Sequence, residues 1–100
     1  MNCAAREGCI RVTVRAFAML HDVVPAEDVV EVPRRSSVGD LLSHLSARHP
    51  GLEDALFAAG ELRAYVNILK GGRNIHFSGG LATPLSDSDI VALFPPAAGG

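Results

Sequence analysis

The sequence predicts an α+β domain in which one main helix covers one face of a single sheet, with the elements in the order ββαβββ. Short runs of alternating apolar and polar residues, typical of half-buried strands, predict the strands. Apolar residues three and four positions apart in one longer run predict the helix. The length of 100 residues fits one domain, and 48% hydrophobic residues are ordinary for a folded one.

The first two strands are expected at residues 10–17 and 29–32, joined through residues 22–25 as a hairpin. Along the first run, valine and alanine alternate with polar residues, so the apolar side chains share one face of the strand. Phe17 has the parity of the polar residues, and it is therefore predicted to lie on the outward face.

The main helix is expected to begin at residue 38 and to end near residues 49–51, where proline and glycine follow each other. Ser37 is a good N-cap, and Asp40 three residues later forms an approximate capping box. A short helical turn is expected at residues 52–57. One stripe of the main helix is apolar: Val38, Leu41, Leu42 and Leu45.

Three further strands are expected at residues 64–69, 74–77 and 90–94. Two glycines between the first and second of them favour a tight turn, because glycine adopts positive φ without strain. Asp87 and Asp89 precede the last strand. We interpret them as turn residues that accept backbone hydrogen bonds, not as a catalytic pair of carboxylates.

Charge and hydropathy argue against several classes of partner. A net charge of −2 gives no electrostatic case for nucleic acid, and no apolar run is long enough for a membrane span. The N-terminal residues lack the layout of a signal peptide, so we expect a cytoplasmic protein. Cys3 and Cys9 lie in or beside a polar extension, residues 1–9, at a spacing that matches no metal or redox motif. We expect both to be reduced thiols.

No motif for catalysis is present in the sequence. It has no phosphate-binding loop, no dinucleotide-binding glycine motif, no zinc-protease motif and no hydrolase serine motif. Its four histidines are scattered, and His44 and His49 are five positions apart on the predicted helix, which does not bring two rings onto one metal ion. We therefore expect no metal site, no bound cofactor and no enzyme activity from this chain.

The end of the chain is its most unusual feature. Pro95 and Pro96 directly follow the last strand, and proline stops a strand because it has no N–H to donate. They are expected to start a stiff, extended tail, residues 95–100, beyond a folded domain of residues 10–94. The only reactive group at its tip is the α-carboxylate of Gly100. The residues beyond the prolines are small enough to thread a narrow channel: Ala97, Ala98, Gly99 and Gly100.

From residue 10 to residue 100, the chain resembles the ubiquitin-like sulfur carriers of the MoaD/ThiS family, which have a β-grasp fold. Residues 91–100, VALFPPAAGG, resemble the end of the MoaD branch. Residues 65–68 and 77–83, YVNI and FSGGLAT, resemble the CysO branch. Two alanines stand where Val-Ala or Val-Thr is expected before Gly-Gly, a small change that leaves the tail narrow. The resemblance does not choose between the branches, and it assigns no role to the N-terminal extension.

The resemblance implies a carrier whose partners supply the catalytic groups. An E1-like enzyme would use ATP and magnesium to adenylate the Gly100 carboxylate, and a sulfur donor would convert it into a thiocarboxylate. An acceptor enzyme would then take the sulfur: the large subunit of molybdopterin synthase, a cysteine-synthase-type enzyme or a thiazole-synthase-like enzyme. Pro95, Pro96, Ala97, Ala98 and Gly99 would thread the partner's active site.

The resemblance also implies a docking patch at Phe17 and Phe94, because aromatic residues at matching positions contact the partner in MoaD-like proteins. The first and last strands are neighbours in a β-grasp sheet, so the two rings are expected to form one exposed apolar patch; the alternative is that either ring belongs to the core. Two other functions stay open. One is a ubiquitin-like modifier whose Gly100 forms an isopeptide bond with a target lysine. The other is a β-grasp binding module whose glycine tail has no role.

Overall fold

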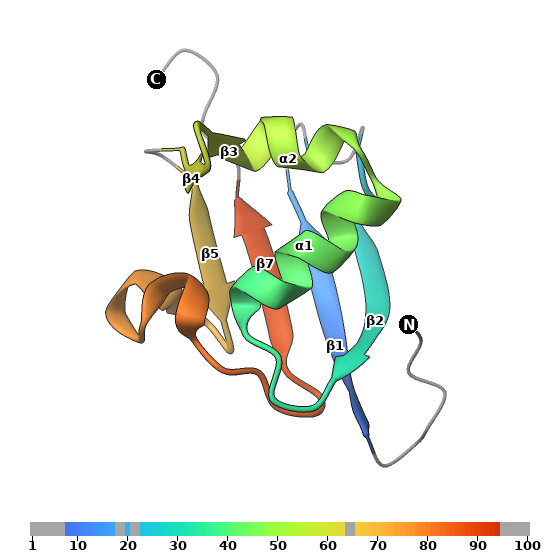
Figure 1. The fold of residues 1–100 in the computed structure, drawn as a ribbon. Coiled ribbons are helices and arrows are strands. Elements are labelled where there is room, and N and C mark those ends of the chain that lie inside the picture. Colours follow the sequence, from blue (N-terminus) through green and yellow to red (C-terminus); the bar gives the residue numbers. More distant parts are fainter. Residues whose placement is uncertain (1–7, 18–19, 21–22, 64–65, 95–100) are drawn as a thin grey trace.

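The computed structural model describes residues 8–17, 20, 23–63 and 66–94 (Figure 1). The predictions for the N-terminal extension up to residue 7, for His21 and for the tail at residues 95–100 lie outside these residues. Within them, one sheet of five strands is covered on one face by the main helix, α1 (Val38–Arg48), which crosses the strands obliquely (Figure 1). The expected α+β architecture is confirmed.

The sheet contains both parallel and antiparallel pairs, and its first and last strands in sequence lie next to each other at its centre. Strand β1 is antiparallel to β2 on one side and parallel to the last strand, β7, on the other. Strand β7 is in turn antiparallel to β5, which pairs with the short β6 at the edge. The spatial order is therefore β2-β1-β7-β5-β6, with these bounds: β1 (Cys9–Ala16), β2 (Glu27–Pro33), β5 (Asn67–Lys70), β6 (Arg73–Asn74) and β7 (Ile90–Phe94).

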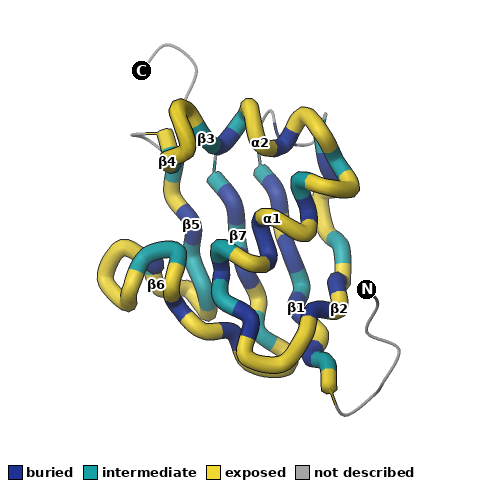
Figure 2. The backbone as a smooth tube through the Cα atoms, viewed as in Figure 1, coloured by how far each residue is buried: buried dark blue, intermediate teal, exposed yellow. Residues whose placement is uncertain are grey.

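Strand parity places the core as the sequence predicts. Residues of β1 alternate between buried and more exposed positions, with Val12, Val14 and Ala16 buried. In β7, Val91 and Leu93 are fully buried. These side chains meet the apolar stripe of α1, so that the buried residues lie between helix and sheet (Figure 2).

Helix α1 begins with the capping box that the sequence predicts. The Ser37 hydroxyl accepts a hydrogen bond from the Asp40 N–H at 3.1 Å, and the Asp40 carboxylate accepts one from the Ser37 N–H at 2.9 Å. Two N–H groups that the first turn leaves without partners are thereby satisfied. The helix ends at His49, and Pro50 precedes a second short helix, α2 (Gly51–Leu56).

The structure departs from the expected strands in the stretch between α2 and β7. A hairpin of two strands, each two residues long, follows α2: β3 (Phe57–Ala58) and β4 (Glu61–Leu62). Strand β5 begins at Asn67, three residues later than the predicted strand. The predicted strand at residues 74–77 is wrong beyond Asn74. The Asn74 side chain accepts a hydrogen bond from the His76 N–H at 2.8 Å, and this cap starts a 3₁₀ turn, η2 (Ile75–Phe77), in place of extended backbone.

The expected reduced state of Cys9 is also wrong, because Cys9 is disulfide-bonded in the structure. A disulfide forms when folding brings two cysteine Cα atoms close together in space. The number of residues between two cysteines in the sequence, which identifies metal and redox motifs, does not give that distance.

Candidate functional site: the root of the tail and its docking face

Strand β7, which directly precedes the predicted tail in the sequence, lies in the middle of the sheet. Val91 and Leu93 are anchored in the core, whereas Ile90, Ala92 and Phe94 point to the face opposite the helix. Phe94 pairs with Asn67 of β5 and is the last described residue before the two prolines. The end of β7 at Phe94, called here the root of the tail, is thus held by a strand on each side, β1 and β5.

Phe17 and Phe94 lie against each other at this root. Their ring centroids are 4.5 Å apart and the rings are within 5° of parallel. The cause is the parallel register of β1 and β7: Ala16 pairs with Leu93, and the Phe17 N–H donates to the Leu93 carbonyl at 3.2 Å. Each ring covers one face of the other, so both are half-buried. The rings come together as expected and are less exposed than an open patch would make them, while their role in docking stays a prediction.

The open face of the sheet carries two further apolar side chains that sequence reasoning did not single out. Val29 of β2 and Ile90 of β7 are 55% and 47% exposed. Both pair with Thr13 of β1, one from each side, so the three side chains form a row across the sheet. Strand parity was the available signal, because Val29 stands one position before the buried Val30 and Ile90 one before the buried Val91. Exposed apolar groups on one face are typical of an interface.

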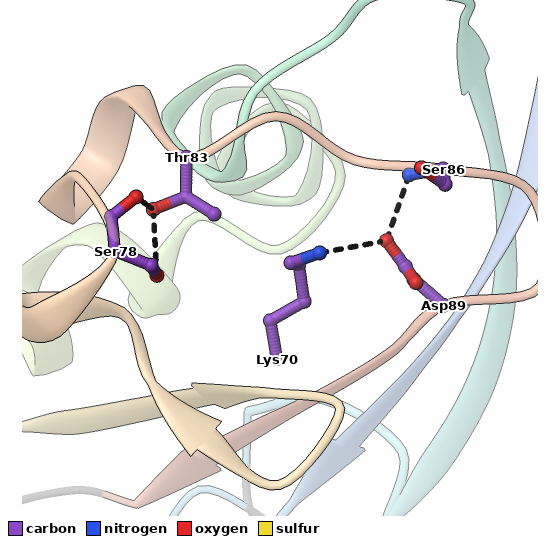
Figure 3. Close-up of polar contacts among 5 residues, drawn as sticks. All are labelled: Lys70, Ser78, Thr83, Ser86 and Asp89. Carbon is purple, nitrogen blue, oxygen red and sulfur yellow. Dashed lines mark hydrogen bonds and ion pairs between the residues drawn. The ribbon is translucent and has the colours of Figure 1, made fainter.

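Within residues 77–83, which resemble the CysO branch, hydrogen bonds between Ser78 and Thr83 hold the loop that follows Phe77 in place. The buried Thr83 hydroxyl donates to the Ser78 carbonyl at 3.0 Å and lies 3.4 Å from the Ser78 hydroxyl (Figure 3). The Thr83 carbonyl accepts the Val38 N–H at 2.9 Å, so this loop also caps the first turn of α1. Gly79 enters the intervening 3₁₀ turn, η3 (Gly80–Ala82), with a φ of +116°, a conformation that favours glycine.

Asp87 and Asp89 act as turn residues, as predicted. The Asp87 carboxylate accepts the Arg11 N–H at 2.8 Å, and the Asp89 carboxylate accepts the Ser86 N–H at 2.7 Å. Asp89 also forms an ion pair with Lys70, whose Nζ lies 3.4 Å from Oδ2 (Figure 3). Sequence reasoning missed this pair, because 19 residues separate its members and only the pairing of β5 with β7 brings them together.

The described residues include no group of three histidine, cysteine or carboxylate side chains that could hold a metal ion. His44 and His76 are both exposed. A hollow of about 470 Å³ lies beside α1. Among the described residues that line it, Glu53 is the one titratable residue, and the others are Phe57 and four small residues: Ser43, Ser46, Ala47 and Gly60. Among these residues no helix is long and apolar enough to span a membrane.

Comparisons with known proteins agree with the fold and identify the family. Residues 14–100 match the model of the ThiS family. Small archaeal modifier protein 3 of Haloferax volcanii is 41% identical over 88 residues, which are 87% of this chain and 96% of that protein. The sulfur carrier protein CysO of Mycobacterium tuberculosis is 37% identical over 67 residues, 64% of this chain and 72% of that protein.

Solved structures of related proteins have the same fold as this chain. The solution structure of the Haloferax volcanii HVO 2177 protein superposes with a TM-score of 0.84 at 37% identity, covering 99% of this chain and 94% of that one. CysO in the Amycolatopsis orientalis BexX/CysO complex superposes with a TM-score of 0.73 at 28% identity, covering 89% of this chain and 99% of that one. The chain belongs to the ThiS family and has the β-grasp fold of its ubiquitin-like sulfur carriers.

Proposed function

We propose that this protein is a sulfur carrier whose Gly100 carboxylate is activated and then converted into a thiocarboxylate. The observation that carries the proposal is the placement of the tail's root. Strand β7 is fixed in the centre of the sheet up to Phe94, and the following residues, Pro-Pro-Ala-Ala-Gly-Gly, add no bulky side chain and end in one carboxylate. A rigid body with a narrow reactive end suits a substrate that is handed between enzymes.

The chemistry requires two steps at one carbon atom. A carboxylate is a poor electrophile, so an E1-like enzyme with ATP and magnesium first forms the Gly100 acyl-adenylate and releases pyrophosphate. A sulfur nucleophile at the oxidation level of sulfide, or a persulfide together with a reducing thiol, then attacks the acyl carbon and displaces AMP. The product is the thiocarboxylate, in which one oxygen atom of the carboxylate has been replaced by sulfur.

This chain supplies the substrate and the docking face, and its partners supply the catalysis. The stacked pair of Phe17 and Phe94 and the exposed Ile90 lie on the face of the sheet opposite α1, and Phe94 directly precedes the tail in the sequence. This suits an enzyme that must cover the end of β7 in order to take up Gly100. Aromatic side chains that are rigid and half-exposed are typical anchors of such interfaces. CysO, a carrier by name, has been solved in complex with BexX, which supports a partner enzyme for this chain as well.

The sulfur acceptor is expected to be one of three classes of enzyme: the large subunit of a molybdopterin synthase, a cysteine-synthase-type enzyme or a thiazole-synthase-like enzyme. The tail is compatible with all three. A second function, conjugation of Gly100 to a lysine of another protein, is favoured by the similarity to a small archaeal modifier protein at 41% identity. Carrier and modifier share the activation step and differ in whether sulfide or an amine attacks the adenylate.

The deciding experiment is mass spectrometry of the intact protein after incubation with the E1-like enzyme of the same genome, ATP, magnesium and sulfide. The expected product has one oxygen replaced by sulfur. A variant without Gly99 and Gly100 is the control, and it is expected to keep the far-UV circular dichroism spectrum and thermal midpoint of the full chain while gaining no sulfur. Failure of the full chain to gain sulfur, or charging of the shortened variant, would refute the proposal. Lysine-linked conjugates in a cell extract, formed with no thiocarboxylate, would establish the modifier instead.

A further inference from the structure

Phe77 is the most exposed large apolar side chain that the structure describes, at 75% exposure. It is not on a loose loop. It ends the 3₁₀ turn η2, which Asn74 caps at its start, and the Ser78 N–H closes the turn on the Ile75 carbonyl at 2.9 Å. The ring of His76 stands edge-on to it, 5.2 Å away at 83°. An aromatic side chain that is already held outward on a fixed turn loses little conformational entropy when it binds a partner.

A hollow of about 410 Å³ lies beside Phe77, between η2 and the edge of the sheet. Its apolar lining comes from Leu62, Val66 and Ile75, and its polar lining includes Arg63 and His76. No carboxylate is among its described lining residues. The hollow therefore suits an apolar side chain that is flanked by negative charge.

The hollow reaches the strand that borders the root of the tail. Asn67 lines it, pairs with Phe94 in the sheet, and accepts a hydrogen bond from the Asn74 side chain at 3.1 Å. Strand β6 pairs only with Leu69 and Lys70, so within the described part of the sheet no strand pairs with Asn67 on this edge. An extended segment can add to an open edge of this kind and place one side chain in the adjacent pocket.

We propose that the Phe77 hollow, meaning Phe77 with the lining just described, binds an extended acidic segment of the enzyme that activates the tail. An apolar side chain of that segment fills the hollow against Phe77, and carboxylates beside it face Arg63 and His76. The inference rests on the proposed function. The activating enzyme is chosen because carrier and modifier both need it, and because it must cover Phe94, whose strand neighbour Asn67 lines the hollow. This contact is separate from the stacked Phe17 and Phe94.

The test measures ATP-dependent pyrophosphate release by the E1-like enzyme of the same genome as the concentration of this protein is varied. Phe77→Ser is expected to raise KM about tenfold or more and to leave kcat unchanged, because a docking anchor holds ground state and transition state equally. Arg63→Glu is expected to raise KM and to weaken its dependence on salt, because it reverses one attracting charge. Phe77→Ser should keep the wild-type thermal midpoint within about 2 °C, since single surface changes usually alter stability little. Arg63→Glu also removes the hydrogen bond from Arg63 Nε to the Asp54 carbonyl at 3.1 Å, so an unchanged far-UV circular dichroism spectrum is the check that it is folded.

Arg34→Glu is the matched control for Arg63→Glu, because Arg34 is an exposed arginine that follows β2, at the other edge of the sheet. Its KM is expected to stay within about twofold of the wild-type value, and a rise equal to that of Arg63→Glu would show a general effect of net charge and would overturn the inference. A KM for Phe77→Ser within twofold of wild type would also overturn it.

Binding is measured separately by isothermal titration calorimetry of the same enzyme with wild-type and Phe77→Ser protein. If the wild-type chain binds and is not activated, the proposed function fails, while weaker binding of Phe77→Ser still supports the hollow. If the two bind equally, the hollow is refuted even where the wild-type chain is activated normally. If the wild-type chain neither binds nor is activated, both proposals fail.

Discussion

Replacing Thr83 by valine tests whether the hydrogen bonds between Ser78 and Thr83 serve only to hold their loop in place. Thr83 is 2% exposed, and its hydroxyl donates to the Ser78 carbonyl at 3.0 Å. Valine has almost the same shape, so the change removes a buried hydroxyl and its hydrogen bond without opening a cavity. A hydrogen bond of this kind contributes about 0.5–1.5 kcal/mol, so we expect Thr83→Val to lower the free energy of unfolding by about 1 kcal/mol.

The assay is unfolding by heat and by urea, followed by far-UV circular dichroism because the chain has no tryptophan. A loss of about 1 kcal/mol corresponds to a fall in Tm of roughly 4–8 °C for a domain of this size. Ser78→Ala is the matched control. The main acceptor is the Ser78 backbone carbonyl, which the variant keeps, and its hydroxyl makes only contacts of 3.4 Å. We therefore expect Ser78→Ala to cost less than about 0.5 kcal/mol.

Two results would refute a purely structural role of Thr83. One is a Thr83→Val protein as stable as the wild type, or a Ser78→Ala protein destabilised as much as Thr83→Val. The other is a Thr83→Val protein that is folded at 25 °C and is no longer charged at Gly100, because Thr83 would then contribute to function directly.

Three further substitutions test the helix start and the core, each followed by the same unfolding measurements. Ser37→Ala removes the acceptor of the Asp40 N–H and is expected to cost about 1 kcal/mol; an unchanged Tm would contradict the cap. Gly39→Ala would ordinarily stabilise a helix by roughly 0.5–1 kcal/mol, but the new Cβ would lie 3.2 Å from the Leu81 carbonyl oxygen, so we expect that gain to be lost, and a full gain would contradict the close approach. Leu93→Ala empties a fully buried position of β7 and is expected to cost about 2–5 kcal/mol, whereas a cost below 1 kcal/mol would contradict its place in the core.

Local patterns predicted the elements wherever one face is buried. In β1 and β7, alternation of apolar residues identified the strands and the face of each residue, because a strand of period two that covers a core must place its apolar side chains on one side. The capping box at Ser37 was visible for a similar reason, since all of its contacts fall within four residues. The hairpin of β3 and β4 escaped prediction because strands of two residues show no period. After Asn74, the apolar residues favour a strand, but the Asn74 side chain accepts a hydrogen bond from the His76 N–H and stabilises a 3₁₀ turn instead.

For the candidate site, the tail was predicted from the sequence alone, because its proposed chemistry depends on residue type and order: two prolines, small residues and a carboxylate at Gly100. It stays a prediction, since residues 95–100 lie outside the described residues. Strand parity also placed Phe17 and Phe94 on the outward face. Tertiary structure decided what those rings contact, since their stacking follows from the parallel register of β1 and β7. Ala16 and Leu93, which pair in that register, are 77 positions apart in the sequence, and only the folded sheet brings them together. The same is true of the Phe77 hollow and of the pair of Lys70 and Asp89, because pairing across the sheet is set by packing of the whole core and not by any local run of residues.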